Sequence, residues 1–394
     1  MGLVTLLSGN RSENLFLPAH GRGQALPKGL SQLLKLRPGI WDLPELFEVG
    51  GPLISTGAIA DSQKSSAAAV GVNRCWYGVN GATGLLQSSL LALARPGQAV
   101  LMPRNVHKSL IQACLLGGIT PILFDLPFLS DRGHYSTFNR DWLRNVIKRS
   151  QGFQDDIAAV VLVNPTYNGY SADMESLIEE IHSHSWPVLV DEAHGAYFVS
   201  GLRPQLPKSA LSFGADLVVH SLHKSAPGLV QSSVLWLQGR RVDPFDVERS
   251  IGLLQTSSPS SLLLASCENA IEELISPSGK KRLSICLNEA EYFTQYLRSK
   301  GLPLLENNDP LRIILHTGKV GLSGIEADEK FIKKKIIGEL PEPGTLTFCL
   351  GFASHKGLAR KFVKIWDEIL DTSVVSENFY LFENPPVEKN SQDL

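Results

Sequence analysis

Short apolar runs alternate with amphipathic stretches through the middle of the chain. Six of these runs predict strands, at residues 99–102, 119–124, 157–163, 188–190, 217–220 and 233–237. The stretches before and between them predict helices, at residues 56–70, 85–94, 106–116 and 174–183. Continuous apolar strands joined by helices are typical of a mostly parallel sheet that is buried on both faces. The pattern therefore predicts an α/β fold with helices on both faces of the sheet.

The pattern is different in the first part of the chain and again at the end of this α/β region. Prolines and glycines interrupt the beginning, which predicts an N-terminal arm with short helices at residues 1–55. The α/β pattern follows and predicts a major domain at residues 56–300. Its last stretch, residues 259–300, has the apolar spacing of one long helical connection.

Beyond this connection the pattern predicts a second, smaller unit. Its expected strands and helix lie at residues 311–315, 319–324 and 346–350, and at residues 328–335. Strands mixed with one helix indicate a small α+β domain, which we place at residues 301–380. A paired proline and a polar end predict a loose tail at residues 381–394.

Composition and charge exclude several classes of protein. Of the 394 residues, 43% are hydrophobic and 19% are charged, with a formal net charge of −2. This balance predicts no nucleic-acid or anionic-membrane partner, and no stretch reaches the roughly 18 apolar residues of a membrane span. The five cysteines have no paired spacing, which predicts reduced thiols in a cytoplasmic protein. His220 and His223 are three residues apart, but no other group of histidines, cysteines or carboxylates has a matching spacing, so we expect no metal site.

Two polar residues follow apolar runs of the predicted sheet. Asp191 comes directly after residues 187–190, and Lys224 comes shortly after residues 215–220. Ligand sites in open α/β sheets collect at the carboxyl ends of the strands. Pyridoxal 5′-phosphate needs a carboxylate against its pyridine nitrogen and a lysine that forms a Schiff base with its aldehyde. The pair therefore predicts a site for this cofactor.

A phosphate group needs hydrogen-bond donors, and two segments offer them. Residues 81–84, which include Ala82 and Thr83, form a glycine-rich turn before a helix and supply backbone N–H groups and a hydroxyl. Ser221 and His223, which lie just before the candidate lysine in the sequence, are a second source of donors. Glycine-rich turns before helices are common, so this turn indicates a phosphate site only in combination with the other candidate residues.

Each candidate also has a plainer interpretation. Asp191 follows a buried strand, where an aspartate is often only a helix N-cap. A single lysine such as Lys224 is usually a solvated surface side chain. His107 follows a strand, where it either caps a helix or stacks on the cofactor ring. The tetrapeptide at 191–194, Asp-Glu-Ala-His, also names one class of helicases. Those enzymes need a Gly-x-x-x-x-Gly-Lys-[Ser/Thr] loop, which this sequence lacks. The candidates occur together at strand ends, which favours the cofactor site.

Several motifs, in order along the chain, carry a resemblance to a known family. They are Pro18–Gly23, Asn80–Gly84, Arg104–Ser109, Asn164–Gly169, Asp191–Ala196, Ser221–Lys224 and Ser257–Pro259. With them the chain, over residues 15–355, resembles the fold-type-I, pyridoxal-phosphate-dependent decarboxylases of ornithine, lysine and arginine, specifically their major domain. It departs from the family's pattern at Ala19, and only residues 383–386 are similar to the family's C-terminal Tyr-Pro-Pro-Gly-Ile-Pro stretch. We expect a short form without the N-terminal wing domain of larger bacterial members.

This resemblance implies a fold, an assembly and a set of roles. The fold is that of fold-type-I transferases, with a mostly parallel seven-stranded sheet, and the assembly is a homodimer with its sites at the interface. The implied cofactor-binding residues are Lys224, Asp191, His107, Ala82, Thr83, Ser221, His223 and Ser257. The implied catalytic residues are Lys224, Asp191, His223 and His194. Ser257 would reach the phosphate of the neighbouring subunit, and His194 would lie near cofactor and substrate.

The implied reaction is α-decarboxylation of a basic amino acid. The substrate amine would displace Lys224, CO2 would leave, and Lys224 or His223 would return a proton to Cα. The same apparatus also serves aminotransferases and β-carbon lyases, because bond choice depends on substrate geometry. A non-catalytic relative that binds the cofactor is a further alternative. The sequence does not distinguish lysine, arginine and ornithine as substrates.

Overall fold

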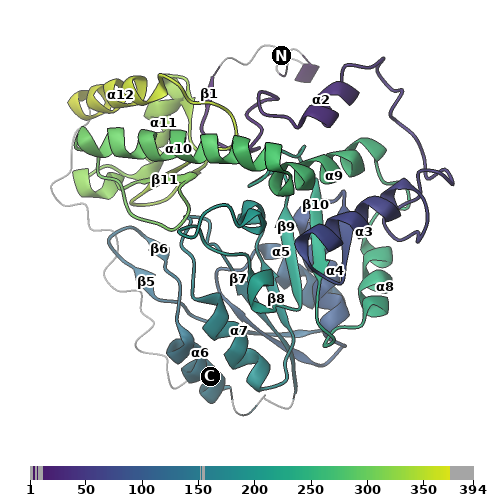
Figure 1. Ribbon diagram of the computed structural model, residues 1–394. Helices are drawn as coiled ribbons and strands as arrows, with labels where there is room; N and C mark the ends of the chain where they lie inside the picture. Colours follow the sequence, from purple (N-terminus) through teal and green to yellow (C-terminus); the bar gives the residue numbers. More distant parts are fainter. Residues whose placement is uncertain (1–2, 5–6, 8–11, 151, 153–155, 373–394) are drawn as a thin grey trace.

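A seven-stranded sheet forms the centre of the computed structural model, which describes residues 3–4, 7, 12–150, 152 and 156–372. Its strands are β2 (Arg74–Gly78), β3 (Ala99–Pro103), β4 (Thr120–Phe124), β7 (Ile157–Val163), β8 (Val188–Asp191), β9 (Leu217–Ser221) and β10 (Ser233–Leu237). They are arranged in the order β2-β10-β9-β8-β7-β3-β4 (Figure 1). Only β10 runs antiparallel to its neighbours β2 and β9. The predicted mostly parallel seven-stranded sheet is confirmed, whereas the expected tail at 381–394 lies outside the described residues.

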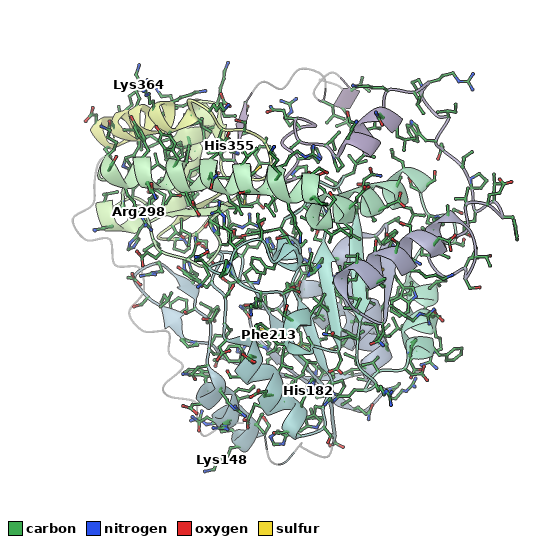
Figure 2. The ribbon with its side chains drawn as sticks, viewed as in Figure 1. Lys148, His182, Phe213, Arg298, His355 and Lys364 are labelled. Carbon is green, nitrogen blue, oxygen red and sulfur yellow. The ribbon has the colours of Figure 1, made fainter. Side chains whose placement is uncertain are left out.

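Both faces of this sheet are buried under helices. Along β7, Val160 and Leu162 belong to one apolar cluster and Val161 to the other, because successive strand residues point to opposite faces. One face is covered by α4 (Gly81–Leu93), α5 (Lys108–Gly117) and α8 (Pro244–Leu254). The other is covered by α3 (Ala58–Val70), α6 (Arg140–Arg149), α7 (Met174–Ser183) and α9 (Ser261–Ile275). Long charged side chains such as Lys148 and Lys364 lie outside this packed interior (Figure 2).

The C-terminal part of the described chain forms a small α+β unit, as predicted. Its antiparallel sheet has the order β11-β14-β13 and consists of β11 (Arg312–Leu315), β14 (Leu346–Cys349) and β13 (Leu340–Pro341). Helices α10 (Pro277–Ser299), α11 (Gly324–Lys333) and α12 (Leu358–Thr372) pack with it (Figure 1). Phe331 of α11 joins the layers, since its ring centroid lies 5.4 Å from Phe348 and 4.9 Å from Phe362.

Short elements connect the larger ones. They are β1 (Glu13–Asn14), α2 (Lys28–Leu33), β5 (Phe128–Leu129), β6 (His134–Tyr135), β12 (Ile336–Ile337) and the 3-10 helices η2 (Ala196–Ser200), η3 (Ala210–Phe213) and η4 (Thr317–Val320). The β1 strand pairs with β12, so the N-terminal arm is attached to the C-terminal unit. Among the described residues, no helix is both long enough and apolar enough to cross a membrane.

The long helical connection predicted at 259–300 is wrong in one respect, because the segment forms two helices. Helix α9 ends at Ile275, Ser276 is extended, and α10 begins at Pro277. Proline lacks an N–H group and disfavours helical backbone at the preceding residue. The Ser276 hydroxyl accepts a hydrogen bond from the backbone N–H of Gly279, which makes Ser276 the N-cap of the second helix.

The strand predicted at 319–324 is also wrong. This segment contains the end of η4, a turn at Gly321 and the start of α11. Ser323 and Glu326 form a capping box, in which each side chain accepts from the backbone N–H of the other residue. The Ser-x-x-Glu spacing in the sequence is the signal for this helix start. The apolar residues around this motif favoured the incorrect prediction of a strand.

Among the described elements of five or more residues, the apolar pattern does not predict β2, α6, α8 and α12. Two of the helices carry standard start signals, since Asn139 caps α6 and Asp243 caps α8 just before Pro244. Strand β2 is only five residues long and lies next to the turn at Asn80. So short an apolar run beside a turn is typical of a loop between two helices. Its last four residues are buried, so tertiary packing stabilises this strand.

Candidate active site

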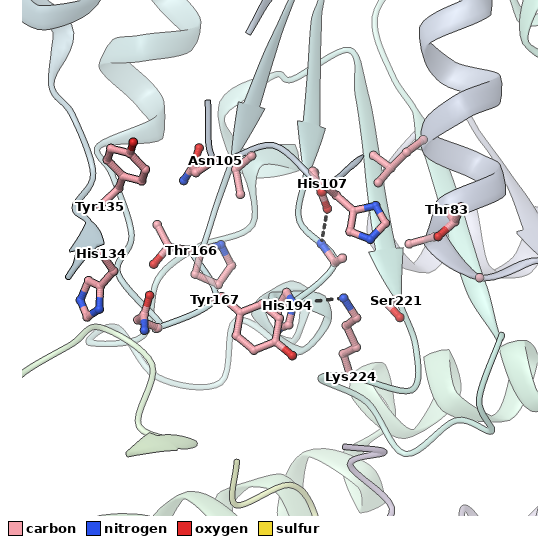
Figure 3. A pocket seen from close by; sticks show the side chains of 18 of the residues that line it. Thr83, Asn105, His107, His134, Tyr135, Thr166, Tyr167, His194, Ser221 and Lys224 are labelled. Atoms are coloured by element: carbon pink, nitrogen blue, oxygen red, sulfur yellow. Dashed lines mark hydrogen bonds between the residues drawn. The ribbon is translucent and has the colours of Figure 1, made fainter. Parts of the chain in front are cut away.

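The candidate site is a cavity of about 370 Å³ at the carboxyl edge of the main sheet. Strand order reverses there, because β4 lies on one side of β3 while β7, β8 and β9 lie on the other. Loops after β3 and after β7 diverge at such a point and leave a crevice. The cavity is lined by residues of both loops, of the α4 N-terminus and of the β8 and β9 ends (Figure 3). The predicted residues that line it are Ala82, Thr83, His107, Asp191, His194, Ser221, His223 and Lys224.

Asp191 is the last residue of β8 and is only 6% exposed. Its neighbours in register are Val163 of β7 and Val219 of β9, so its carboxyl group stands at the centre of the sheet edge. Oδ1 accepts a hydrogen bond from the backbone N–H of Ala193 at 3.1 Å. Burial raises the pKa of this carboxyl above its usual range, and the positive charge of Lys224 only partly opposes the shift.

Lys224 lies three residues beyond the end of β9 and lines the same cavity as Asp191. Its Nζ atom is 3.1 Å from Nε2 of His194 and 5.9 Å from the ring centroid of Tyr167 (Figure 3). Burial lowers the pKa of the amine, and the carboxylate of Asp191 opposes this shift. The structure therefore brings the predicted lysine and the predicted acid into one cavity.

His194 contacts the lysine and connects it to the C-terminal unit. Its Nδ1 atom is 2.9 Å from Nη2 of Arg312, a buried residue at the start of β11. Tyr167 packs against the imidazole with the ring centroids 4.4 Å apart. Burial lowers the pKa of His194 well below its usual value, and the positive charges of Lys224 and Arg312 lower it further.

The first turn of α4 offers an anion site. Asn80 occupies the N-cap position, but its side chain does not cap the helix and instead donates to the carbonyl of Leu254. Gly81 has a φ of +67°, a conformation that favours glycine. The first N–H groups of a helix have no partner within it. The open helix start therefore presents Ala82 and Thr83 to the cavity.

Ser221 and His223 line the cavity beside this helix start. The Ser221 hydroxyl and Nδ1 of His223 are 3.0 Å apart, so a hydrogen bond joins them. Burial lowers the pKa of His223 to about 4, and the charge of Lys224 contributes to the shift. At neutral pH this imidazole is therefore uncharged and can act as a donor or an acceptor.

His107 is both a helix cap and a residue of the cavity. It is the N-cap of α5, where its Nδ1 accepts from the backbone N–H of Ser109 at 3.2 Å. The ring lines the cavity near Thr83 (Figure 3). The capping interpretation is thus confirmed, and stacking on a cofactor ring stays a prediction. The nearby Asn105 also lines the cavity, and its buried Oδ1 has no hydrogen-bond partner among the described residues.

The end of the cavity away from Lys224 contains residues to which the sequence assigns no role. His134 and Tyr135 lie there (Figure 3). Glu342, from the turn before β14, completes this end. Its Oε2 atom is 3.1 Å from Nδ1 of His134, and it accepts from Nδ2 of Asn168 at 2.7 Å and from the hydroxyl of Thr345 at 3.0 Å. Oε1 accepts no hydrogen bond from the described residues.

The other acidic residue of the Asp-Glu-Ala-His motif has a different place. Glu192 is fully buried and accepts hydrogen bonds from the backbone N–H of Ala210 at 2.9 Å and from Nε2 of His220 at 2.7 Å. His220 Nδ1 accepts from the indole N–H of Trp236 at 2.8 Å. This network holds β8, β9 and β10 together below the cavity. These hydrogen bonds account for Glu192 of the motif as a structural residue, with no part in the chemistry of the cavity.

Ser257 is the one predicted site residue that does not line the cavity. It is exposed in the segment between α8 and α9. Residues that sequence reasoning missed come from the loop after β3, from β6, from the segment after β7 and from the C-terminal unit. Tyr167 and Asn168 stand in the quoted motif at 164–169, so that motif was their signal. Arg312 had a weaker signal, namely a charge at the start of an apolar strand.

Known proteins share much of this sequence. The arginine decarboxylase of Bacillus anthracis is 30% identical to the chain over 326 residues, which cover 79% of the chain and 64% of the relative. The chain therefore spans somewhat less than two thirds of the length of this relative.

Solved structures of lysine decarboxylases share the fold. The constitutive enzyme of Escherichia coli superposes with a TM-score of 0.71 at 19% identity, covering 93% of this chain and 59% of that one. Lysine decarboxylase A of Pseudomonas aeruginosa gives a TM-score of 0.73 at 16% identity, with coverages of 83% and 53%. The model of the family described as Orn/Lys/Arg decarboxylase, major domain, matches residues 40–317. The predicted fold class is thus confirmed, and the chain belongs to the Orn/Lys/Arg decarboxylase family.

Proposed function

We propose that this protein is a pyridoxal-phosphate-dependent α-decarboxylase of a basic amino acid. One observation carries the proposal: Lys224 and Asp191 line a single cavity together with the uncapped start of α4. These are an amine, a carboxyl group and an anion site. Together they match the aldehyde, the pyridine nitrogen and the phosphate of the cofactor.

The residues present fit the cofactor at each of its polar ends. The open N–H groups of α4, with the hydroxyls of Thr83 and Ser221, suit a phosphate. Asn105 Oδ1 is a buried acceptor whose hydrogen-bond capacity no described residue uses, and it lines the same cavity. The exposed face of the His107 ring suits an aromatic neighbour. Lys224 and Asp191 would then hold the aldehyde and the ring nitrogen.

When bound, pyridoxal phosphate supplies an aldehyde that condenses with amines and a ring that takes up the electron pair released as CO2 departs. Asp191 provides a negative charge at the β8 end that stabilises a protonated ring nitrogen. His107 restricts motion on one face of the cavity. Lys224 accepts and returns protons at Nζ, and His223 is the alternative proton donor for Cα.

The acidic far end of the cavity favours a basic substrate within this proposal. Glu342 has one carboxylate oxygen held by three partners and a second oxygen that accepts from none of the described residues. A carboxylate fixed in this way attracts an ammonium or guanidinium group. The substrate side chain would point from Lys224 toward Glu342, which supports lysine, arginine or ornithine over apolar amino acids.

Release of CO2 from carboxyl-labelled amino acids tests the proposal. The full chain is mixed with pyridoxal phosphate and with lysine, arginine or ornithine, and Lys224→Ala serves as the control. Labelled CO2 from at least one substrate, together with its loss in Lys224→Ala, is the expected result. Keto acid formation without CO2 would instead identify an aminotransferase, and a cofactor absorption band without turnover would identify a non-catalytic relative.

We further propose that the chain works as a homodimer with a site near the subunit interface. Ser257 is exposed and outside the cavity of its own chain, so only another copy could use its hydroxyl at the phosphate. Light scattering should give twice the chain mass. Ser257→Ala should weaken cofactor binding, and an unchanged cofactor affinity in a dimeric Ser257→Ala variant would remove this role.

A further inference from the structure

We propose that Arg312 is a positioning residue that fixes the proton of the His194 ring on Nε2 and thereby holds Lys224 as a free amine. This inference rests on the proposed function insofar as that function uses Lys224 as a nucleophile. The observation that carries it is a row of three side chains. Arg312 Nη2 lies 2.9 Å from His194 Nδ1, and His194 Nε2 lies 3.1 Å from Lys224 Nζ.

Donor and acceptor rules leave one assignment for this row. A guanidinium group carries only donors and stays protonated in proteins, so Nδ1 of His194 must accept from Arg312. A neutral imidazole that accepts at Nδ1 carries its proton on Nε2. That N–H faces Lys224 Nζ and therefore needs a lone pair on the lysine nitrogen. An ammonium group has no lone pair, so the geometry requires the neutral amine.

Arg312 is confined by burial and lies beside one carboxylate. It is 4% exposed at the start of β11, and its carbonyl accepts from Asn307 Nδ2 at 3.0 Å. Asp309 lies below it, with Oδ2 4.0 Å from Arg312 Nε. The other oxygen of Asp309 accepts from the Tyr197 hydroxyl at 2.7 Å and from the backbone N–H of Leu311 at 2.9 Å. The C-terminal unit thus delivers a buried cation to the main-sheet site.

The imidazole is confined as well. His194 is 8% exposed, and the Tyr167 ring packs on it with the centroids 4.4 Å apart. The Tyr167 hydroxyl donates to Glu339, which also accepts from the backbone N–H of Leu17 at 2.8 Å. A ring packed in this way cannot readily flip to exchange its two nitrogens. The hydrogen-bond pattern is therefore a property of the fold.

Groups of both signs act on Lys224 from the surrounding elements. They are Asp191 at the end of β8, Arg312 on β11, Glu339 before β13, Cys349 on β14, and the imidazoles of His107, His194 and His223. Asp191 and Glu339 favour the ammonium form, whereas Arg312 opposes it. Removal of Arg312 should therefore shift the balance toward the ammonium form, because the two carboxylates remain.

Nitrogen NMR of histidine-labelled protein tests the first step. In a neutral imidazole the protonated and unprotonated nitrogens have well separated shifts, and His194→Gln identifies the signals of residue 194. We expect the Nε2–H form in the wild-type chain near neutral pH. In a variant without the guanidinium we expect the Nδ1–H form, because its unprotonated Nε2 can accept a hydrogen bond from the Lys224 ammonium. An Nδ1–H signal in the wild-type chain would overturn the proposal.

The variant must keep the buried charges balanced. Arg312→Met alone leaves Asp309 buried without a cation, so the double variant Arg312→Met/Asp309→Asn is the main test. The amide oxygen introduced at position 309 can still accept from Tyr197 and Leu311. Arg312→Lys keeps a cation and a donor and should preserve the wild-type pattern. Thermal unfolding of each variant confirms that the chain is folded.

Trace labelling with acetic anhydride tests the second step. The free amine attacks the carbonyl carbon and acetate leaves, so labelling of Lys224 at each pH reports its unprotonated fraction. The exposed Lys364 in the same digest serves as the internal reference. We expect the Lys224 midpoint to rise by about one pH unit or more in the double variant and to stay near the wild-type value in Arg312→Lys. An unchanged midpoint in the folded double variant would refute the role of Arg312.

These measurements separate the two proposals. Both are made on the full chain freed of pyridoxal phosphate, so they do not depend on turnover. If no amino acid yields CO2 but the double variant shifts the tautomer and the midpoint, the proposed function fails and the role of Arg312 stands. If CO2 is released but neither readout moves, the opposite holds.

Discussion

Burial moves the two principal groups of the site toward their neutral forms. It raises the pKa of Asp191 and lowers the pKa of Lys224, although each group's charge opposes the shift of the other. Without a ligand, the cavity disfavours the charged forms of both the amine and the acid. A ligand that carries charges of its own can stabilise these charged forms. The phosphate and ring nitrogen of the proposed cofactor are such charges.

Asp191→Asn tests the acid at the end of β8. Asparagine keeps the shape and can still accept from the backbone N–H of Ala193, but it cannot stabilise a protonated ring nitrogen. We expect kcat for the best basic amino acid to fall on the order of 10³-fold, about 4 kcal/mol of transition-state stabilisation. Steady-state kinetics at saturating cofactor measure this change.

The matched control is Asp173→Asn, which changes an N-cap aspartate of α7 away from the cavity. It should leave kcat near the wild-type value, because asparagine caps helices as well as aspartate does. Equal activity of Asp191→Asn and the wild-type enzyme would remove Asp191 from the mechanism.

Glu342→Gln tests the recognition of the substrate side chain. The amide can keep contacts with Asn168 and Thr345 but loses the negative charge at the far end of the cavity. We expect KM for lysine or arginine to rise about 10-fold or more, since one lost charge contact is worth about 1.4 kcal/mol or more. The change in kcat should be small. Substrate titration distinguishes the two.

Glu306→Gln is the control, because Glu306 has a side chain that is 91% exposed. If Glu342→Gln lowers kcat and leaves KM unchanged, Glu342 acts elsewhere than in side-chain binding. A neutral analogue of lysine should lose nothing in Glu342→Gln, and a loss equal to that for lysine would argue against charge recognition.

Local signals predicted Asp191 and Lys224 at the edge of the main sheet but not Arg312 and Glu342 of the C-terminal unit. Asp191 and Lys224 follow apolar runs, and parallel strands bring such positions to one edge regardless of the rest of the fold. Glu342 lines the cavity, and Arg312 contacts the cavity residue His194, only through the packing of a second unit against the first. No pattern within residues 301–350 encodes that docking, so these two residues needed the structure.

At the scale of elements, the start of α4 combines three properties that a phosphate needs. The N-cap side chain points elsewhere, and Gly81, whose own N–H donates to the carbonyl of Gln231, allows the tight turn. The next N–H groups, those of Ala82 and Thr83, have no partner among the described residues. The positive end of the helix dipole adds to the attraction for an anion. The Asn80–Gly84 segment is thus a candidate anion site.

Thr83→Val tests this helix start without changing its shape. Loss of the hydroxyl should weaken binding of pyridoxal phosphate about 5- to 10-fold, as expected for one hydrogen bond to a charged group. Inorganic phosphate should compete less well with the cofactor in the variant. Equilibrium titration, followed through the cofactor's absorption, measures both.

Ser88→Ala provides the comparison on the same helix. The Ser88 hydroxyl is buried and donates to the carbonyl of Gly84, outside the cavity lining. Its removal affects the helix but not the anion site, so cofactor affinity should stay close to the wild-type value. Equal losses in Ser88→Ala and Thr83→Val would point to a structural effect.

Elements with continuous or periodic apolar patterns were predicted well, and elements defined by single capping residues were not. The helix predicted at 174–183 has the observed bounds of α7, Met174–Ser183. The break at Ser276 and the start of α11 at Ser323 each depend on one cap and its N–H partners. Such signals occupy one to four residues and are easily outweighed by nearby apolar residues.

At the scale of the whole molecule, the site depends on how three parts of the chain meet. The main sheet supplies Asp191 and Lys224, and the C-terminal unit supplies Arg312 and Glu342. The N-terminal arm contributes as well, because the backbone N–H of Ala19 donates to the carbonyl of His223 at 2.8 Å. Loss of packing between these parts would therefore disturb the site before it unfolded the sheet.

This meeting of parts also buries several neutral histidines, and that makes stability depend on pH. Burial lowers the pKa of His20, His194 and His223, the last to about 4. An unfolded histidine titrates near 6.5. Below 6.5 and above its folded-state pKa, each of these histidines binds more protons in the unfolded chain than in the folded chain, so its contribution lowers the free energy of unfolding as pH falls.

We expect these histidines to destabilise the cofactor-free chain from pH 6.5 toward pH 4, by up to about 1 kcal/mol per pH unit each, while the raised pKa of Asp191 opposes this loss. Urea unfolding at a series of pH values measures the slope. His223→Asn, which can keep the acceptor facing Ser221 but cannot titrate in this range, should have a shallower slope than the wild-type chain. Identical slopes would show that His223 is protonated in the folded state, because only a group with different proton occupancy in the two states contributes to the pH dependence.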